Sequence, residues 1–408
     1  MWIRSCRLYG LFALTALASA CGTKTVVRST GAGADDAGAA VAVPCTGDTD
    51  CLAGKEICDI PVGTCTATAG GVEIGSGDGS PGSVVLTEIY STRKSAELTD
   101  LQFSGSERTQ LWAIGYGNDS VHVGLGVSET EKGTWKEFVD PAAGHFMHKP
   151  PAIAWGTEGF WGICGDNDNA QNDPQGQPNY FMGPALFSSD LDVFAKATAG
   201  GLGSHYDMLH NTSKCRGIAH AEDNVFWTFN GEVGSLDRYD FKKPHAPGAD
   251  DHSDGEILRY ARGVVKGVEG VSSHLFFDVT DRYLYVADTG NKRIIRLDTS
   301  SGMAGAPLPR QNEPLVKNAL MKDAKLEEIV ASGILEQPSG LEIHGGLLYV
   351  TDAATGFFHV FDRGGRPVRQ LDTGLGPEAL SGFAFGPDGK IWFTDRSRGK
   401  VLRIDPVQ

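Results

Sequence analysis

The sequence predicts an all-β protein whose main domain is a six-bladed β-propeller. A unit of alternating apolar strands separated by turns recurs six times after residue 98. Each unit carries an aromatic anchor in its second strand; the anchors are Trp112, Trp161, Trp227, Tyr285, Tyr349 and Trp392. The strand Ser83–Ser91 precedes the first unit, and we expect it to complete the last unit, closing the ring and removing open sheet edges.

The first twenty residues have the pattern of an export signal. Two arginines precede an apolar run of 13 residues, Leu8 to Ala20, which is too short to span a bilayer but suits a signal peptide. The small residues before Cys21 resemble the lipobox of bacterial lipoproteins, which implies that Cys21 carries lipid. Ala18 departs from that pattern, where leucine is usual, so an ordinary secretory signal is the alternative. Gly22, by resemblance to lipoprotein sorting rules, points to the outer membrane of a Gram-negative bacterium.

Two segments separate this signal (1–20) from the propeller (83–408). Residues 21–44 are rich in Gly and Ala and predict a flexible tether, and residues 67–82 predict a second flexible linker. Between them, residues 45–66 hold four cysteines: Cys45, Cys51, Cys58 and Cys65. The wide gaps between them and the oxidising compartment favour two disulfides over a structural zinc site, and all three pairings stay open.

The charge balance excludes one class of partner. The formal net charge is −15 and the chain has no basic tract, so it lacks the Lys/Arg face that nucleic acid binding requires. We expect a monomer whose partners are a membrane, reached through the lipid anchor, and either a small-molecule or peptide ligand or a protein or glycan.

The last three units carry the clearest repeat. PSGLEIHGGLLYVTDAATGFFHVFD (from Pro338) matches LSGFAFGPDGKIWFTDRSRGKVLRID (from Leu380) and SSHLFFDVTDRYLYVADTGNKRIIRLD (from Ser272). These units resemble the NHL repeat, and weaker copies begin at Thr99, Lys149 and Cys215. The stretch NALMKDAKLEEIVASGI (from Asn318) looks partly helical, with its second half an outer strand.

The resemblance implies which loops share a face. In such propellers the connection that enters each innermost strand lies on one rim, the top. Four histidines fall in these positions and form a candidate site for a divalent metal, zinc or calcium: His148, His205, His210 and His274. The opening at His274 resembles that of the peptidyl-hydroxyglycine amidating lyases, six-bladed propellers with an axial metal bound by histidine. On this reading Asp207 or Tyr206 serves as base and Arg216 stabilises negative charge; the alternative is that each histidine is merely solvated.

A second polar cluster joins the third and fourth strands of the third unit, which the same geometry puts on the bottom or outer side, away from His274. Its residues are His245, Asp250, Asp251, His252 and Asp254. They suit a calcium-type loop or, equally, a loop pinned by Asx-turns.

Cys164 and Cys215 fall on the same rim of adjacent units, which predicts a disulfide between them. Two functions stay open. One is a metal-dependent lyase or hydrolase of the cell envelope that acts on a small polar or peptide-derived substrate. The other is a non-catalytic propeller that binds protein or glycan at the cell surface.

Overall fold

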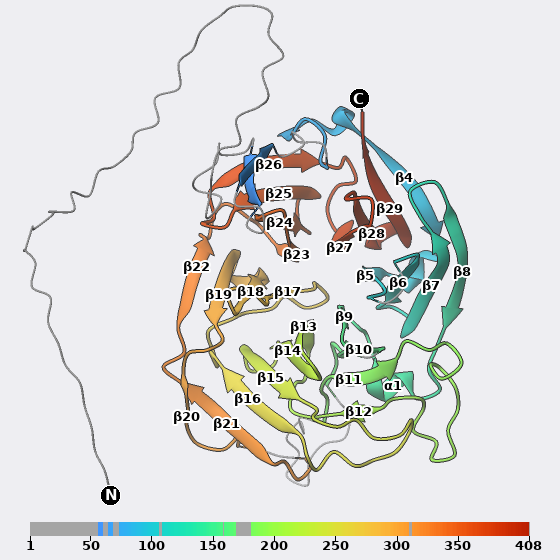
Figure 1. The fold of residues 1–408 in the computed structure, drawn as a ribbon, viewed down its shortest axis with the longest axis vertical. Helices are drawn as coiled ribbons and strands as arrows, with labels where there is room; N and C mark the ends of the chain where they lie inside the picture. Colours follow the sequence, from blue (N-terminus) through green and yellow to red (C-terminus); the bar gives the residue numbers. More distant parts are fainter. Residues whose placement is uncertain are drawn as a thin grey trace, which may run out of the picture. The chain divides into compact units, whose positions relative to one another are not determined.

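The structure is a computed structural model that describes residues 56–59, 64–67, 73–105, 108–157, 159–168, 181–309 and 312–407. Six antiparallel sheets stand around one axis (Figure 1), which confirms the predicted six-bladed β-propeller. From the axis outward, blade one consists of β5 (Leu98–Phe103), β6 (Gln110–Gly115), β7 (Ser120–Val127) and β8 (Lys132–Phe138). Blade two consists of β9 (Ile153–Trp155), β10 (Phe160–Ile163), β11 (Ala185–Ser188) and β12 (Asp207–Met208).

Blades three and four are linked by a long connection within blade four. Blade three consists of β13 (Cys215–Glu222), β14 (Val225–Asn230), β15 (Ser235–Asp240) and β16 (Glu256–Tyr260). Blade four consists of β17 (Leu275–Asp278), β18 (Tyr283–Asp288), β19 (Arg293–Asp298) and β22 (Leu326–Val330). The connection from β19 to β22 adds two strands to the outside of blade three, β20 (Met303–Ala304) and β21 (Lys317–Lys322). The stretch that looks partly helical in the sequence is therefore strand in both halves.

Blades five and six close the ring. Blade five consists of β23 (Pro338–His344), β24 (Leu347–Asp352), β25 (Phe357–Asp362) and β26 (Pro367–Asp372). Blade six consists of β27 (Leu380–Phe385), β28 (Ile391–Asp395), β29 (Lys400–Pro406) and, as its outer strand, β4 (Val84–Ser91). The antiparallel pairing of β4 with β29 confirms the predicted closure.

The aromatic anchors occupy the second strand of each blade, as predicted. Because side chains alternate along a strand, each anchor points into the space between neighbouring blades. All six are at most 2% exposed. Trp112 of blade one, for example, lies 5.6 Å from Trp161 of blade two, measured between ring centroids.

The segment before β4 corrects one prediction. Part of the expected linker 67–82 packs against blade five instead of hanging free. The strand β3 (Asp78–Gly79) pairs with β26 in parallel, Ile74 is fully buried, and Glu73 pairs with Arg369.

The cysteine-rich segment is described only in part. Strands β1 (Glu56–Asp59) and β2 (Thr64–Ala67) pair in antiparallel register, which sets Cys58 opposite Cys65. Cys45 and Cys51 lie outside the described residues, as do the predicted signal, Cys21 and the tether, so the pairing of the four cysteines stays a prediction.

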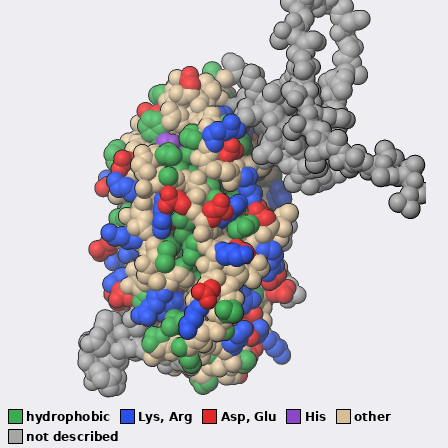
Figure 2. All heavy atoms as spheres, turned by 90° about the vertical axis from the view of Figure 1, so that its left-hand side faces the viewer, with side chains coloured by type: hydrophobic (Ala, Val, Ile, Leu, Met, Phe, Trp, Pro, Cys, Tyr) green, Lys and Arg blue, Asp and Glu red, His purple; other side chains and the backbone are tan. Residues whose placement is uncertain are grey.

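Positive and negative side chains are interspersed on the side of the propeller that Figure 2 shows, with no large area of one sign. On blade four, for example, Arg293 and Arg296 pair with Glu328 and Glu327 of β22. None of the helices in the described ranges has the length and apolar character that a membrane crossing requires.

Candidate metal centre at the edge of blade two

Three histidines from two neighbouring blades meet beside the outermost strand of blade two. His205 comes just before β12, whereas His245 and His252 lie in the loop between β15 and β16 of blade three. Backbone hydrogen bonds join the two segments: the His245 amide donates to the Tyr206 carbonyl (3.0 Å) and the Gly248 amide to the His205 carbonyl (2.8 Å). The three ring centroids lie between 5.1 and 6.2 Å apart.

Each of these imidazoles is held through its Nδ1 atom. The Nδ1 contacts are 2.8, 2.7 and 2.8 Å long for His205, His245 and His252, and the acceptors are the Leu202 carbonyl, the Ala246 carbonyl and the Asp207 carboxylate. Carbonyl and carboxylate oxygens accept hydrogen bonds, so these contacts place a ring hydrogen on each Nδ1, and in a neutral ring Nε2 then carries the lone pair. At His252 carboxylates face both ring nitrogens, so a metal at Nε2 would have to displace a second proton. Metal-binding histidines are oriented in the same way by partners behind the ring.

The geometry of the three rings suits a single ion. One ring nitrogen from each histidine lies within 4.8 Å of those of the other two. Nε2 of His245 is buried and has no hydrogen-bond partner among the described residues. The exposed carboxylate of Asp250 lies 3.2 Å from Nε2 of His252 and is available as a further oxygen ligand. This set of three imidazoles favours zinc or a similar transition metal over calcium, which prefers oxygen ligands.

Burial shapes the protonation of this group. Burial lowers the pKa of His205 to about 4, which keeps this imidazole neutral at physiological pH. Burial also acts to lower the pKa of His252, but the hydrogen bond and charge of Asp207 outweigh it and the pKa is raised. The pKa of Asp207 is raised because it is buried, although the His252 contact acts in the opposite direction.

The remaining acidic residues of the blade-three loop have structural roles. Asp251 accepts hydrogen bonds from the amide and hydroxyl of Ser253, and Asp254 accepts one from the Lys243 amide. They pin the loop, as the Asx-turn reading predicts. The loop was predicted to lie on the bottom or outer side, away from His274, and His205 was assigned to the top rim, but the histidines of the loop and His205 form one cluster. The reason is that His205 directly precedes the outer strand of blade two, where backbone hydrogen bonds join it to the outer loop of blade three.

A cavity of about 630 Å³ adjoins this cluster. Five of the 11 histidines of the chain line it: His145, His148, His205, His210 and His252. Phe146 and Phe181 supply apolar walls, and Asn167 and Phe181 come from the two ends of the polar insert that follows β10. Three of the four predicted metal-binding histidines, at positions 148, 205 and 210, thus share one cavity.

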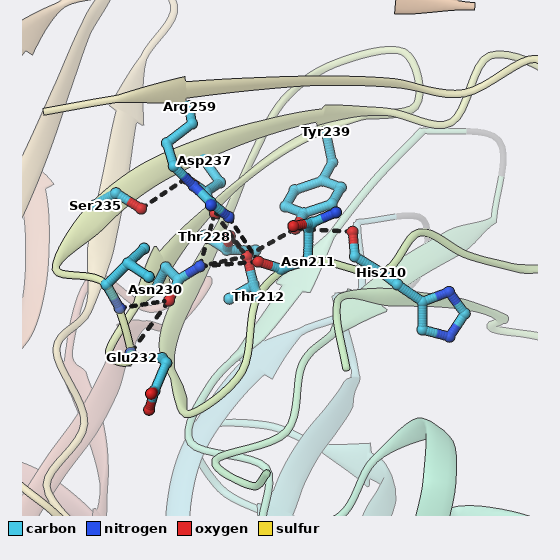
Figure 3. Close-up of polar contacts among 11 residues, drawn as sticks. His210, Asn211, Thr212, Thr228, Asn230, Glu232, Ser235, Asp237, Tyr239 and Arg259 are labelled. Carbon is cyan, nitrogen blue, oxygen red and sulfur yellow. Dashed lines mark hydrogen bonds and ion pairs between the residues drawn. The ribbon is translucent and has the colours of Figure 1, made fainter. Parts of the chain in front are cut away.

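His210 is held rigidly at the wall of this cavity. Its backbone amide and its Nδ1 bond the two carboxylate oxygens of Glu313, at 2.9 and 2.7 Å. The residues that follow join a buried polar network in blade three: Arg259 donates to the Asn211 carbonyl (2.6 Å), and Thr212 donates to Asp237 (2.9 Å). Figure 3 shows this network, with the His210 imidazole directed away from it.

His274, the fourth predicted ligand, lies at the axis instead. A Cβ added to Gly382 of blade six would lie 2.0 Å from an Asp100 oxygen and 2.7 Å from the His274 ring, so only glycine fits between these two. Nδ1 of His274 is 3.9 Å from Asp100, and Nε2 is buried without a partner among the described residues. No described contact joins His274 to the cavity, so the structure does not bring the four predicted histidines together.

The predicted catalytic residues are also dispersed. Arg216 is buried and pairs with Asp166, which also accepts a hydrogen bond from Tyr116 (2.8 Å). Asp207 supports His252, and the Tyr206 ring packs edge-on against Phe160. The predicted disulfide between Cys164 and Cys215 is present and links blade two to blade three.

The chain is similar in fold to streptogramin B lyase. The match has a TM-score of 0.50 at 13% identity and covers 79% of this chain and 98% of that structure. An auxiliary nutrient binding protein from Bacteroides thetaiotaomicron matches with a TM-score of 0.51 at 12% identity, over 79% of this chain and 76% of its own. One from Bacteroides ovatus gives 0.50 at 12% identity, over 80% and 77%. No protein-family model and no curated protein matches the sequence, so the comparisons show the fold alone.

Sequence reasoning found all three histidines of the cluster but assigned them to different sites. What unites them is the backbone hydrogen bonding of residues 205 and 206 to the loop between β15 and β16, which neither segment's sequence predicts. Glu313, which holds His210, was not singled out, because more than one hundred residues separate the two in the chain.

Proposed function

We propose that this protein is a metal-dependent lyase or hydrolase of the cell envelope that acts on a small polar or peptide-derived substrate. His205, His245 and His252 are the proposed ligands of one zinc-like ion, bound through Nε2. The observation that carries the proposal is that one ring nitrogen from each histidine lies within 4.8 Å of those of the other two, while acceptors hold all three Nδ1 atoms and so leave Nε2 as the ligand atom of each neutral ring.

The proposed chemistry requires an open coordination position beside a substrate cavity. Three histidine ligands are typical of catalytic zinc sites, in which the fourth position takes water or substrate. An ion held in this way polarises a carbonyl or lowers the pKa of a bound water. The cavity beside the cluster supplies the space, and Asp207 orients His252 from behind. The similar solved structures include a lyase and nutrient binding proteins, so the fold supports catalysis and binding equally.

Metal analysis of the purified protein tests the proposal. We expect one zinc ion per chain in the wild type and the loss of at least nine tenths of it in His245→Ala, because this residue supplies one of three ligands and otherwise holds no partner through Nε2. His274→Ala is the matched control: it also removes a histidine whose buried Nε2 has no partner among the described residues, and it should keep the zinc.

Two results would contradict this assignment. If His274→Ala loses zinc and His245→Ala keeps it, the ion belongs at the axis. A folded wild type that takes up no zinc would favour the alternative, a non-catalytic propeller that binds protein or glycan.

We also propose that lipid on Cys21 anchors the protein at the membrane surface, as the signal and lipobox-like residues indicate. Membrane fractionation of the wild type and of Cys21→Ser is the test, and the variant should appear in the soluble fraction.

A further inference from the structure

His210 lines the cavity beside the proposed metal centre and carries a ring nitrogen with no hydrogen-bond partner among the described residues. Its side chain is 6% exposed, and Nε2 is buried with no partner among the described residues. Because Nδ1 faces a carboxylate oxygen of Glu313, the ring hydrogen lies on Nδ1 and Nε2 carries a lone pair. A buried acceptor without a partner costs free energy, which a ligand with a hydroxyl or amine would recover.

The position of this acceptor is fixed before any ligand arrives. Glu313 holds both the backbone amide and the ring of His210, and the next two residues are tied to the network of Asp237 and Arg259. A pre-positioned group loses little conformational freedom on binding.

The walls around His210 favour a flat ligand. Phe181 stacks on the His210 ring at 3.9 Å, and Phe146 stacks on His205 at 3.7 Å. Met182 and Leu202 add apolar surface, and no Lys or Arg is among the described residues that line the cavity. Apart from a bound ion, the described lining thus offers nothing with a permanent positive charge to an anionic group.

We propose that the cavity binds a small carboxylate with a flat apolar body, whose carboxylate meets the His205–His245–His252 centre and whose hydroxyl or amine donates a hydrogen bond to Nε2 of His210. The inference rests on the proposed function and names its ligand class. The His210 and His252 rings are neighbours, with centroids 6.4 Å apart and planes nearly perpendicular, so the acceptor and the proposed centre lie within reach of one small ligand.

Substituted benzoates test this arrangement on zinc-loaded protein by calorimetry. 3-Aminobenzoate carries a donor, 3-acetylbenzoate carries only an acceptor, and benzoate carries neither. We expect 3-aminobenzoate to bind the wild type about fivefold to tenfold more tightly than benzoate, the range for one hydrogen bond. His210→Ala should lose this preference and keep its zinc.

His148→Ala is the matched control. This residue lines the same cavity and is also held at Nδ1 by a carboxylate, that of Asp119. Its side chain, however, is 34% exposed, and its Nε2 is not among the buried atoms without a hydrogen-bond partner. The preference for 3-aminobenzoate should survive this substitution.

Glu313→Gln provides a second, subtler variant. The backbone amide of His210 needs an acceptor, so the single amide oxygen of the new side chain faces it and the NH₂ group faces Nδ1. The ring hydrogen then moves to Nε2, which becomes a donor. We expect the preference to reverse, with 3-acetylbenzoate binding more tightly than 3-aminobenzoate.

The outcomes separate this inference from the proposed function. If the wild type binds no zinc, the proposed function fails and this inference fails with it. If zinc binds but the preference persists in His210→Ala, or if no benzoate binds, only this inference is overturned. Loss of zinc in His210→Ala would make His210 a metal ligand and also overturn it.

Discussion

Glu342 shows how burial controls a single residue at the axis. It lies on β23, two positions after Gly340, and lines a cavity of about 310 Å³ at the opposite end of the channel from the loop that enters β17. Burial and, to a smaller extent, the nearby charge of Asp100 raise the pKa of Glu342 to about 8. Burial also raises the pKa of Asp100, and lowers that of His274 to about 4. These three groups therefore favour their neutral forms.

The raised pKa of Glu342 predicts a pH dependence of stability. The folded pKa of about 8 exceeds the model value of 4.5, so the folded state prefers the protonated form. The resulting stability is fully present below pH 4.5 and is lost as the pH rises to 8. We expect Glu342→Gln, which stays neutral, to be more stable than the wild type at pH 9 by about 2 kcal/mol. This figure is smaller than the full pKa shift would give, because the carboxyl lines a cavity.

Chemical denaturation at pH 4.5 and pH 9 measures this difference. The two proteins should have similar free energies of unfolding at the lower pH. Glu131→Gln, an exposed substitution, serves as the control and should change stability equally at both pH values. An equal effect of Glu342→Gln at both values would show that folding does not raise the pKa of this carboxyl.

The type of a residue predicts which ligand or catalytic group it can supply better than it predicts which residues surround it in the fold. The sequence identified His205, His245 and His252 as metal-binding candidates, because imidazole is a common ligand. It could not predict that Leu202, Ala246 and Asp207 occupy their Nδ1 atoms, because such contacts depend on loop conformation. It also grouped His274 with residues from which the structure separates it.

At the scale of elements, the strands were predictable and the connections were not. Alternation of apolar residues and one aromatic per unit define β6, β10, β14, β18, β24 and β28. The prediction that residues 318–322 are partly helical is wrong. This stretch pairs with β16 as a strand, and pairing with a neighbouring strand overrides the local helical preference. The prediction that residues 67–82 form a flexible linker is wrong around Ile74. This one buried side chain suffices to dock an otherwise polar segment.

The disulfide between Cys164 and Cys215 is a link between two blades that the sequence predicted correctly. It closes a segment with a sequence separation of 51 residues, which constrains the unfolded chain. We expect the double variant Cys164→Ala, Cys215→Ala to lose about 2–4 kcal/mol of unfolding free energy. Thermal denaturation of the oxidised proteins measures the loss, and the reduced wild type should match the variant. A difference near zero would show that blade packing alone holds this pair of strands.

At the scale of the whole molecule, stability depends on β4. This strand comes from the start of the propeller and completes the blade that holds the end of the described chain, so it covers an edge that β29 would otherwise expose. The sequence predicted this closure because Ser83–Ser91 reads as a strand with no partner in the first unit.

Two truncations test the role of ring closure, both exported with the same foreign signal peptide. A chain that begins at residue 73 keeps β3 and β4 and should remain a folded monomer. A chain that begins at residue 92 lacks β4 and should aggregate or unfold at a temperature at least 10 °C lower, because the loss of one blade strand costs several kcal/mol. Light scattering and circular dichroism distinguish the two. A monomeric, equally stable shorter chain would show that five complete blades hold the sixth without closure.

The histidine cluster affects the stability of the boundary between blades two and three. His205 belongs to blade two, whereas His245 and His252 belong to blade three. An ion bound there would be a reversible cross-link between blades two and three, in addition to the disulfide between Cys164 and Cys215. That boundary would then respond to two features of the surroundings, the supply of metal and the redox state. Both would change how tightly blades two and three are held together.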